Sequence, residues 1–129
     1  MAVLRITANI AHPDPAQVAD FYRQVLGLQV AMDMGWIVTL AGEGPGPIQL
    51  STMSEGGSGT PVPPLSVEVD DLDGVLDRAR SLGHAPEYGP VDEPWGVRRA
   101  VLRDPAGTLV NVLVHLPGPE ARRHRRYRP

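Results

Sequence analysis

The sequence predicts an α+β fold in which two consecutive modules, each of the order strand, helix and three strands (βαβββ), form one domain over residues 1–117. The chain has 129 residues, of which 42% are hydrophobic, and this suffices for one core. No apolar run approaches the roughly 18 residues of a membrane span. The aspartates that precede the two amphipathic stretches, Asp14 and Asp71, are about 57 residues apart, and Val18 and Val75 keep that offset. This repeat indicates an internal duplication.

The first module, about residues 3–53, begins with a strand over 3–10. Apolar and polar residues alternate there, so that one face is apolar and the other polar. Asp14 is placed to cap a helix whose first position is Pro15 and whose end is marked by Gly27. The apolar stripe of that helix recurs at spacings of three and four: Val18, Phe21, Tyr22, Val25 and Leu26.

Three short strands are expected after this helix, followed by a linker. The strands fall at about 28–33, 36–41 and 47–52, with glycine and proline between them. Residues 54–63 are rich in Gly, Ser and Pro, which predicts a flexible linker between the modules.

The second module, about residues 64–116, repeats the order of the first. A strand over 65–69 precedes the capping residue Asp71 and a helix that Gly83 ends. Its apolar stripe consists of Leu72, Val75, Leu76, Ala79 and Leu82. Strands are then expected at about 85–91, 97–103 and 108–115, the last two joined by a tight turn over 104–107.

Composition excludes several kinds of chemistry. The chain has no cysteine, so disulfides, thiolate metal sites and cysteine nucleophiles are excluded. It has no lysine, which excludes a Schiff base on a lysine side chain. Much of its arginine lies in residues 118–129, which we interpret as a disordered, solvated tail, and the body before it is acidic. An acidic body argues against a nucleic acid partner.

Four motifs occur in order along the chain: Ala19–Leu28 (ADFYRQVLGL), Val67–Asp73 (VEVDDLD), Glu93–Arg99 (EPWGVRR) and Asp104–Asn111 (DPAGTLVN). Together they resemble the vicinal oxygen chelate superfamily, which includes glyoxalase, bleomycin resistance proteins and extradiol dioxygenases, over about residues 3–116. The resemblance implies a mixed, curved sheet that forms a cleft, with one main helix per module on the convex face. It also implies a divalent metal bound by His, Glu or Gln in enzymes, or a metal-free cleft in proteins that sequester antibiotics.

The family's ligand positions argue against a metal in this chain. They fall near Thr7, near Gln49 or Ser51, near Pro64 or Ser66, and at Asn111. Neutral amides and hydroxyls alone bind transition metals weakly. Of the four histidines, His12, His84, His115 and His124, only His115 shares the face of the cleft, toward its rim. We therefore expect no metal and no cofactor.

Strand parity and position predict the residues of the cleft. On the cleft face parity places Arg5, Thr7, Asn9, Gln49, Ser51, Ser66, Glu68, Leu109, Asn111 and Leu113. Glu68 is a weak candidate for a general base, and the alternative is a surface carboxylate paired with Arg5 or Arg99. The predicted ligand-binding residues are Thr7, Asn9, Trp36, Gln49, Ser51, Ser66, Glu68, Trp95, Arg99 and Asn111.

Two tryptophans and two adjacent arginines add to this prediction. The rings of Trp36 and Trp95 suit stacking on a planar ligand, although packing at the rim or in a dimer explains them equally well. One of Arg98 and Arg99 must face the cleft in a regular strand, where its guanidinium suits a carboxylate or phosphate.

The first functional hypothesis is a metal-independent protein that binds a small molecule, such as an antibiotic or a planar metabolite. The alternative is a metal-dependent lyase, isomerase or dioxygenase of the same superfamily with a divergent site, and a third reading is an interaction subunit with a vestigial cleft. We expect a homodimer that pairs modules within one chain or exchanges them. We expect no membrane partner, and, without a visible signal peptide, a cytoplasmic location.

Overall fold

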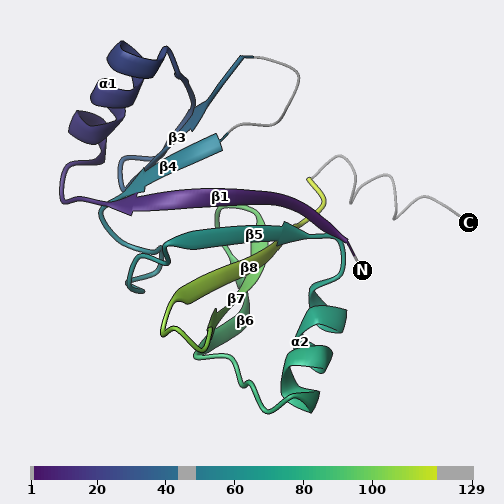
Figure 1. The fold of residues 1–129 in the computed structure, drawn as a ribbon. Helices are drawn as coiled ribbons and strands as arrows, with labels where there is room; N and C mark the ends of the chain where they lie inside the picture. The colour runs from purple at the N-terminus through teal and green to yellow at the C-terminus, as the bar shows by residue number, and fades with distance from the viewer. Residues whose placement is uncertain (1, 44–48, 119–129) are drawn as a thin grey trace, which may run out of the picture.

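Two βαβββ modules form one eight-stranded sheet with two helices in the computed structural model, which describes residues 2–43 and 49–118 (Figure 1). Module 1 contains β1 Val3–Ala11, α1 Pro15–Leu26, β2 Gln29–Asp33, β3 Ile37–Ala41 and β4 Gln49–Met53. Module 2 contains β5 Leu65–Val69, α2 Leu72–Ser81, β6 Tyr88–Glu93, β7 Val97–Arg103 and β8 Leu109–His115. This architecture confirms the predicted α+β fold.

The duplication is visible in the order of the strands, β2-β3-β4-β1-β5-β8-β7-β6. β1 and β5, the first strands of the two modules, pair antiparallel at the centre. Each also pairs in parallel with the last strand of its own module, β1 with β4 and β5 with β8. The two halves are therefore joined edge to edge within one chain, which makes a single continuous sheet.

The helices begin where the sequence predicts. Asp14 accepts a hydrogen bond from the backbone N–H of Gln17 at 3.3 Å, and Asp71 accepts one from Gly74 at 3.0 Å. These bonds satisfy N–H groups that a helix leaves without partners in its first turn. Gly27 ends α1 with a φ of 71°, a left-handed conformation that glycine adopts without steric penalty.

Each helix packs on strands of its own module. Under α1, Ala19 packs with Val38 and Leu40 of β3. Under α2, Leu72 and Leu76 pack with strand residues Val69, Ala100 and Val112. Figure 1 shows the helices at opposite ends of the sheet, with β1 and β5 between them. The centre of this convex face is left uncovered, and Leu4 and Ile6 of β1 are 55% and 61% exposed.

Three expectations from the sequence either differ from the structure or concern residues outside the part of the chain that it describes. β6 begins at Tyr88 and continues to Glu93 instead of covering 85–91, because residues 84–86 form no regular secondary structure. Residues 47 and 48 of the third strand expected in module 1, and the tail from 119, lie outside the described residues. No helix of the described residues is long and apolar enough to span a membrane.

The linker over residues 54–63 is held against module 2, although its composition predicted flexibility. The backbone N–H of Gly56 donates to the carbonyl of Thr60 at 2.7 Å, which closes a tight loop. Arg99 of β7 donates to the carbonyl of Gly57 at 3.0 Å, and Ser58 donates to Glu93 of β6 at 2.9 Å. The linker thus acts as a cover over one end of the second module.

Candidate functional site

A cavity of about 340 Å³ lies on the face of the sheet that points away from the helices. Of the predicted ligand-binding residues, all but Arg99 line it: Thr7, Asn9, Trp36, Gln49, Ser51, Ser66, Glu68, Trp95 and Asn111. Arg5 and Leu113 also line it, as parity predicted, whereas Leu109 does not. The sheet brings these side chains together because Thr7 lies opposite Ser66, and Ser66 lies opposite Asn111, across neighbouring strands.

The floor of the cavity is a cluster of two amides around one hydroxyl. Ser66 Oγ accepts hydrogen bonds from Asn9 Nδ2 at 2.8 Å and from Asn111 Nδ2 at 3.2 Å. Asn9 Nδ2 also donates to the carbonyl of Pro63 at 2.9 Å, and because that carbonyl can only accept, the orientation of the Asn9 amide is determined. The cluster joins three strands at the junction of the two modules.

The floor of the cavity contains buried hydrogen-bond acceptors that have no donor partner. Among the described residues, Asn9 Oδ1 and Asn111 Oδ1 are buried side-chain oxygens with no hydrogen-bond partner. Leaving a buried acceptor unpaired costs about 1–3 kcal/mol, which a ligand or an ordered water that donates a hydrogen bond would recover. The floor is therefore suited to a ligand that carries N–H or O–H groups.

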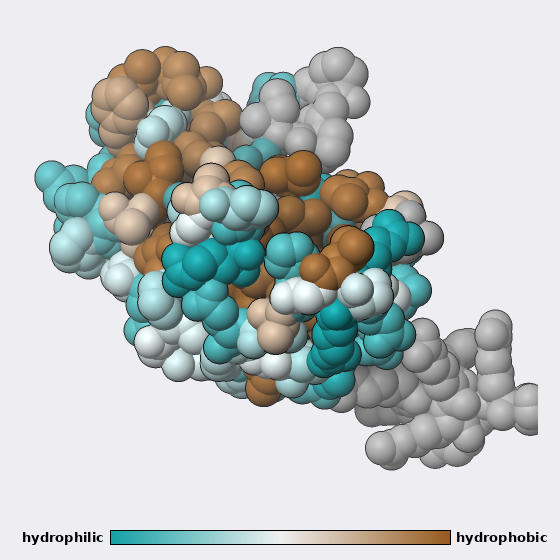
Figure 2. All heavy atoms as spheres, turned by 60° about the horizontal axis from the view of Figure 1, so that its bottom comes forward, coloured by the Kyte–Doolittle hydropathy of each residue, from teal (hydrophilic) through white to brown (hydrophobic). Residues whose placement is uncertain are grey.

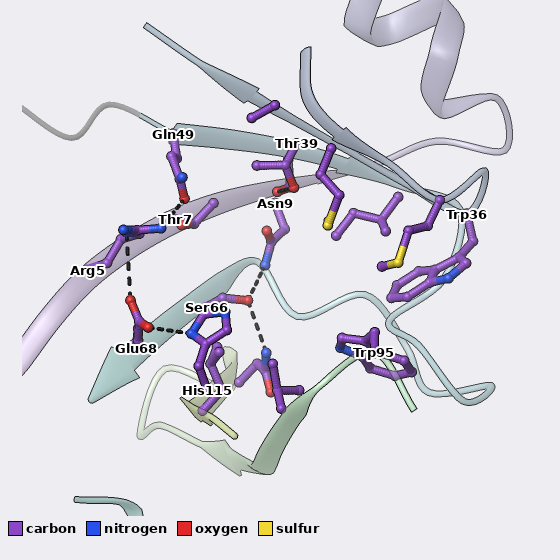
Figure 3. A pocket seen from close by; sticks show the side chains of 18 residues that line it. Arg5, Thr7, Asn9, Trp36, Thr39, Gln49, Ser66, Glu68, Trp95 and His115 are labelled. Atoms are coloured by element: carbon purple, nitrogen blue, oxygen red, sulfur yellow. Dashed lines mark hydrogen bonds and ion pairs between the residues drawn. The ribbon is translucent and has the colours of Figure 1, made fainter. Parts of the chain in front are cut away.

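One side of the cavity holds its ionisable groups (Figure 3). Glu68 Oε2 contacts His115 Nδ1, and Glu68 Oε1 lies 3.8 Å from Arg5 Nε. Arg5 Nη1 in turn donates to Gln49 Oε1 at 3.1 Å. The carboxylate thus has two cationic or proton-donating neighbours. Of the two partners considered from the sequence, the structure pairs Glu68 with Arg5 and not with Arg99.

The opposite side is aromatic and apolar. Figure 3 places Trp36 and Trp95 together, across the cavity from Arg5 and Glu68. Their ring centroids are 5.1 Å apart, with the planes at 62°. Gly57 of the linker packs against both rings, and a Cβ there would lie 2.7 Å from Trp95 Cη2. The two tryptophans therefore come from different modules and are held together by the linker.

Arg99 lies on the predicted face of β7 but does not reach the cavity. Its side chain is 1% exposed and donates from Nε to Glu93 Oε2 at 2.7 Å. The guanidinium also lies 4.9 Å from the ring centroid of Tyr88 and 5.3 Å from that of Trp95. Parity assigned the face correctly, but the linker and Trp95 cover the side chain. Its neighbour Arg98 points the other way and pairs with exposed Asp92 at 3.0 Å.

The protonation of Glu93 follows from these contacts. Burial raises the pKa of the Glu93 carboxyl, but hydrogen bonds from Arg99, Ser58 and Tyr88, together with the charge of Arg99, outweigh burial and bring the pKa below its ordinary value. The ionised carboxylate is thus the stable form beneath the linker.

The donors at the family's metal positions do not fit a transition metal. Gln49 Oε1 already accepts from the guanidinium of Arg5, whose charge repels a cation. Ser66 Oγ already receives N–H groups from two amides. Over residues 2–43 and 49–118, no three His, Asp or Glu side chains lie close enough together to hold a metal ion. The oxygens that remain at these positions belong to neutral hydroxyls and amides, and neutral groups alone bind transition metals weakly.

Sequence reasoning missed one contact between side chains in the cavity and one wall of the cavity. His115 was placed on the cleft face, but its pairing with Glu68 was not foreseen, although the parallel pairing of their strands would bring them together. The missed wall is largely apolar and comes mainly from module 1: Ala31, Met32, Met34, Ile37, Thr39 and Val97. The sequence of β2 shows little alternation of apolar and polar residues, because all five of its residues are exposed or open to the cavity.

Comparison with solved structures shows the same fold at low identity. A methylmalonyl-CoA epimerase variant from Streptomyces coelicolor, in complex with 2-nitronate-propionyl-CoA, gives a TM-score of 0.68 at 19% identity, covering 90% of this chain and 100% of that chain. A glyoxalase/bleomycin resistance protein/dioxygenase superfamily member from Vibrio splendidus gives 0.63 at 15% identity, covering 89% and 100%. A Legionella pneumophila structure described as an NAD-dependent benzaldehyde dehydrogenase gives 0.68 at 14%, covering 86% and 99%.

Comparison of sequences gives the family. No curated protein matches this chain. The family model of the glyoxalase/bleomycin resistance protein/dioxygenase superfamily matches residues 4–112, which span most of both modules and include Asn9, Ser66 and Asn111 of the cavity floor. The chain therefore belongs to the glyoxalase/bleomycin resistance protein/dioxygenase superfamily.

Proposed function

We propose that the protein binds a small planar molecule, such as an antibiotic or a planar metabolite, in this cavity without a metal ion. The observation that carries the proposal is the arrangement of the cavity, with unpaired amide oxygens of Asn9 and Asn111 at its floor and the Trp36–Trp95 pair at one side. Cavities that bind organic ligands combine apolar walls with a few polar groups, at volumes of about 300–1,000 Å³. The 340 Å³ found here suits a ligand at the small end of that range.

Metal independence is supported by the chemistry of the family's ligand positions. Thr7, Ser66 and Asn111 supply only neutral groups, and Arg5 adds a positive charge beside Gln49. We expect purified protein to contain no stoichiometric Zn²⁺, Ni²⁺ or Fe²⁺ by metal analysis. Tightly bound metal at one equivalent per chain would contradict the proposal and favour the metal-dependent lyase, isomerase or dioxygenase.

The two tryptophans provide a direct test of binding. They are the only two tryptophans of the sequence and both line the cavity, so tryptophan fluorescence, excited selectively over the three tyrosines, reports on this site. We expect planar compounds of one or two fused rings, among them 5-nitrobenzisoxazole, to quench it saturably, with the same affinity in the presence of EDTA. Asn111→Leu, which removes a floor amide, should weaken binding about tenfold. Arg98→Ala, on the opposite face, should leave affinity unchanged.

Two outcomes would contradict this function. If none of these small planar compounds quenched the tryptophans saturably, the cavity would not be a site for planar ligands. If EDTA abolished quenching, binding would depend on a metal.

We also propose that the protein is a homodimer. The uncovered centre of the convex face supports this, because Leu4, Ile6 and Leu65 are 55%, 61% and 37% exposed there, and Phe21 of α1 is 55% exposed. Figure 2 shows apolar side chains, in brown, beside hydrophilic ones on the face that it displays. Apolar surface of this kind is typical of contacts between subunits. Light scattering should give the mass of two chains, and Ile6→Glu should halve it. A monomer in the unsubstituted protein would refute the assignment.

A further inference from the structure

We propose that His115, oriented by Glu68, is a general base that removes a proton from a molecule bound in the cavity. This adds a catalytic step to the binding function and rests on that function, because the substrate occupies the same cavity. The pair arises from the parallel pairing of β5 with β8, in which Glu68 lies opposite Leu113. His115, two residues further along β8, projects from the same face, and its Nδ1 contacts Glu68 Oε2 (Figure 3).

The contact determines which ring nitrogen is available. An ionised carboxylate only accepts hydrogen bonds, so the Nδ1 of a neutral His115 that contacts it carries the proton. The lone pair is then on Nε2, the nitrogen that a base needs. The side chain of His115 is 60% exposed, whereas that of Glu68 is 16% exposed. The imidazole is therefore the accessible member of the pair, and the carboxylate is the member that holds it.

Arg5 and Gln49 hold the carboxylate from its other side. Glu68 Oε1 lies 3.8 Å from Arg5 Nε, and Arg5 Nη1 donates to Gln49 at 3.1 Å. This chain of contacts restrains Glu68, and through it the ring of His115. Arg5 also lines the cavity, so its guanidinium faces the same space as the ring of His115. Stabilisation of developing charge by a fixed cation is a major source of rate acceleration in enzymes.

A purely structural ion pair explains the arrangement less well. At 60% exposure of one partner, such a pair contributes at most about 1 kcal/mol to stability. The pair also lies in the cavity, where Arg5, Glu68 and His115 are the only ionisable side chains among the lining residues. Every acid–base group of the cavity therefore belongs to one connected network.

The proposed step balances without a further reactant. The substrate X–H gives its proton to His115 Nε2, and the electron pair of the X–H bond remains on X. The imidazole becomes an imidazolium whose charge Glu68 compensates, and the anion lies near Arg5. The imidazolium then returns the proton to X. In an elimination, the electron pair instead expels a leaving group with its bonding electrons, and the imidazolium releases its proton to water.

The test uses 5-nitrobenzisoxazole, a planar carbon acid that reports on a base without any other catalytic group. Removal of the proton at C3 forms the nitrile with the C–H electron pair, and the N–O bond breaks to give a coloured phenolate. We expect the protein to open this ring at a saturable rate that rises with pH in one step. His115→Ala should lower the rate about 100-fold. Glu68→Gln should also lower it, because the amide no longer holds the ring in the tautomer with its lone pair on Nε2 and no longer compensates the imidazolium.

Controls separate catalysis from folding and from binding. His84→Ala removes an exposed histidine outside this cavity and should leave the rate unchanged. Free imidazole should partly restore the rate of His115→Ala, which a collapsed site would not allow. Tryptophan quenching by the same compound measures occupancy. Quenching without acceleration in the unsubstituted protein would overturn the general base and leave the binding function intact, whereas an absence of quenching would overturn binding.

Nitrogen-15 NMR of the histidine ring gives an independent readout that needs no substrate. We expect His115 to carry its proton on Nδ1 when neutral, and the proportion of this tautomer to fall in Glu68→Gln. A His115 protonated on Nε2 would place no lone pair toward the cavity and would overturn the proposal.

Discussion

Replacing Arg99 by methionine tests the buried ion pair that holds the linker against module 2. The side chains of Arg99 and Glu93 are 1% and 4% exposed. Methionine keeps much of the apolar volume but leaves the Glu93 carboxylate with only the hydroxyls of Ser58 and Tyr88 as partners. It also frees the carbonyl of Gly57, which Arg99 Nη2 contacts at 3.0 Å.

The expected loss is large because one charge of a buried pair is left behind. Removing one partner of such a pair costs about 3–5 kcal/mol. For a chain of 129 residues, this corresponds to a fall in Tm of roughly 10 °C or more. The loss should appear in urea denaturation at neutral pH followed by far-UV circular dichroism, since Trp95 packs on Arg99 and its fluorescence would change for local reasons.

Arg98 provides a matched control on the same strand. Its side chain is 39% exposed and its partner Asp92 is 59% exposed. Arg98→Met makes the identical chemical change and should cost less than about 1 kcal/mol. Combining Arg99→Met with Glu93→Leu should recover part of the loss, because no buried charge is then unpaired.

Two results would refute this reasoning. Equal losses in Arg98→Met and Arg99→Met would show that burial does not set the cost. A double variant less stable than Arg99→Met alone would show that the unpaired carboxylate is not the source of the loss.

Three further predictions concern other contacts of the fold. The folded-state pKa of Glu93 is below 4.5, so its ionised form stabilises the protein above about pH 4.5. The free energy of unfolding should therefore exceed that of Glu93→Gln at neutral pH, and this difference should shrink as the pH falls through the folded pKa. Urea titrations between about pH 7 and pH 3 check this, and a difference that stays constant with pH would refute it. Gly57→Ala should destabilise the protein by about 1–3 kcal/mol, because φ is 91° at this position and the new Cβ meets Trp95. The contact with Trp95 should also alter the near-UV circular dichroism, and an unchanged spectrum would contradict it. Thr52→Val removes the 2.9 Å hydrogen bond that the fully buried Thr52 hydroxyl donates to the carbonyl of Pro15. The free energy of unfolding, measured by urea denaturation, should fall by about 1–3 kcal/mol. An unchanged free energy of unfolding would mean that water replaces the hydroxyl.

Local sequence patterns were sufficient for the elements and for the face on which each side chain lies. The caps at Asp14 and Asp71 begin both helices because a side-chain oxygen satisfies N–H groups within three residues. Alternation in β1 placed Thr7 and Asn9 opposite Leu4 and Ile6, since successive residues of a strand point to opposite faces. Such rules act over a few residues and need no knowledge of the tertiary structure.

Only the tertiary structure decided what covers each face and which side chains meet. Arg99 is on the predicted face but is buried by a linker residue 42 positions away in the sequence. Glu68 and His115, separated by 47 positions, meet because β5 and β8 pair in one register. The sequence alone determined the two modules and the polar surface of the cleft. The register between strands and the path of the linker arise from contacts between distant residues, and these contacts decided the cavity, its acid–base pair and its aromatic wall.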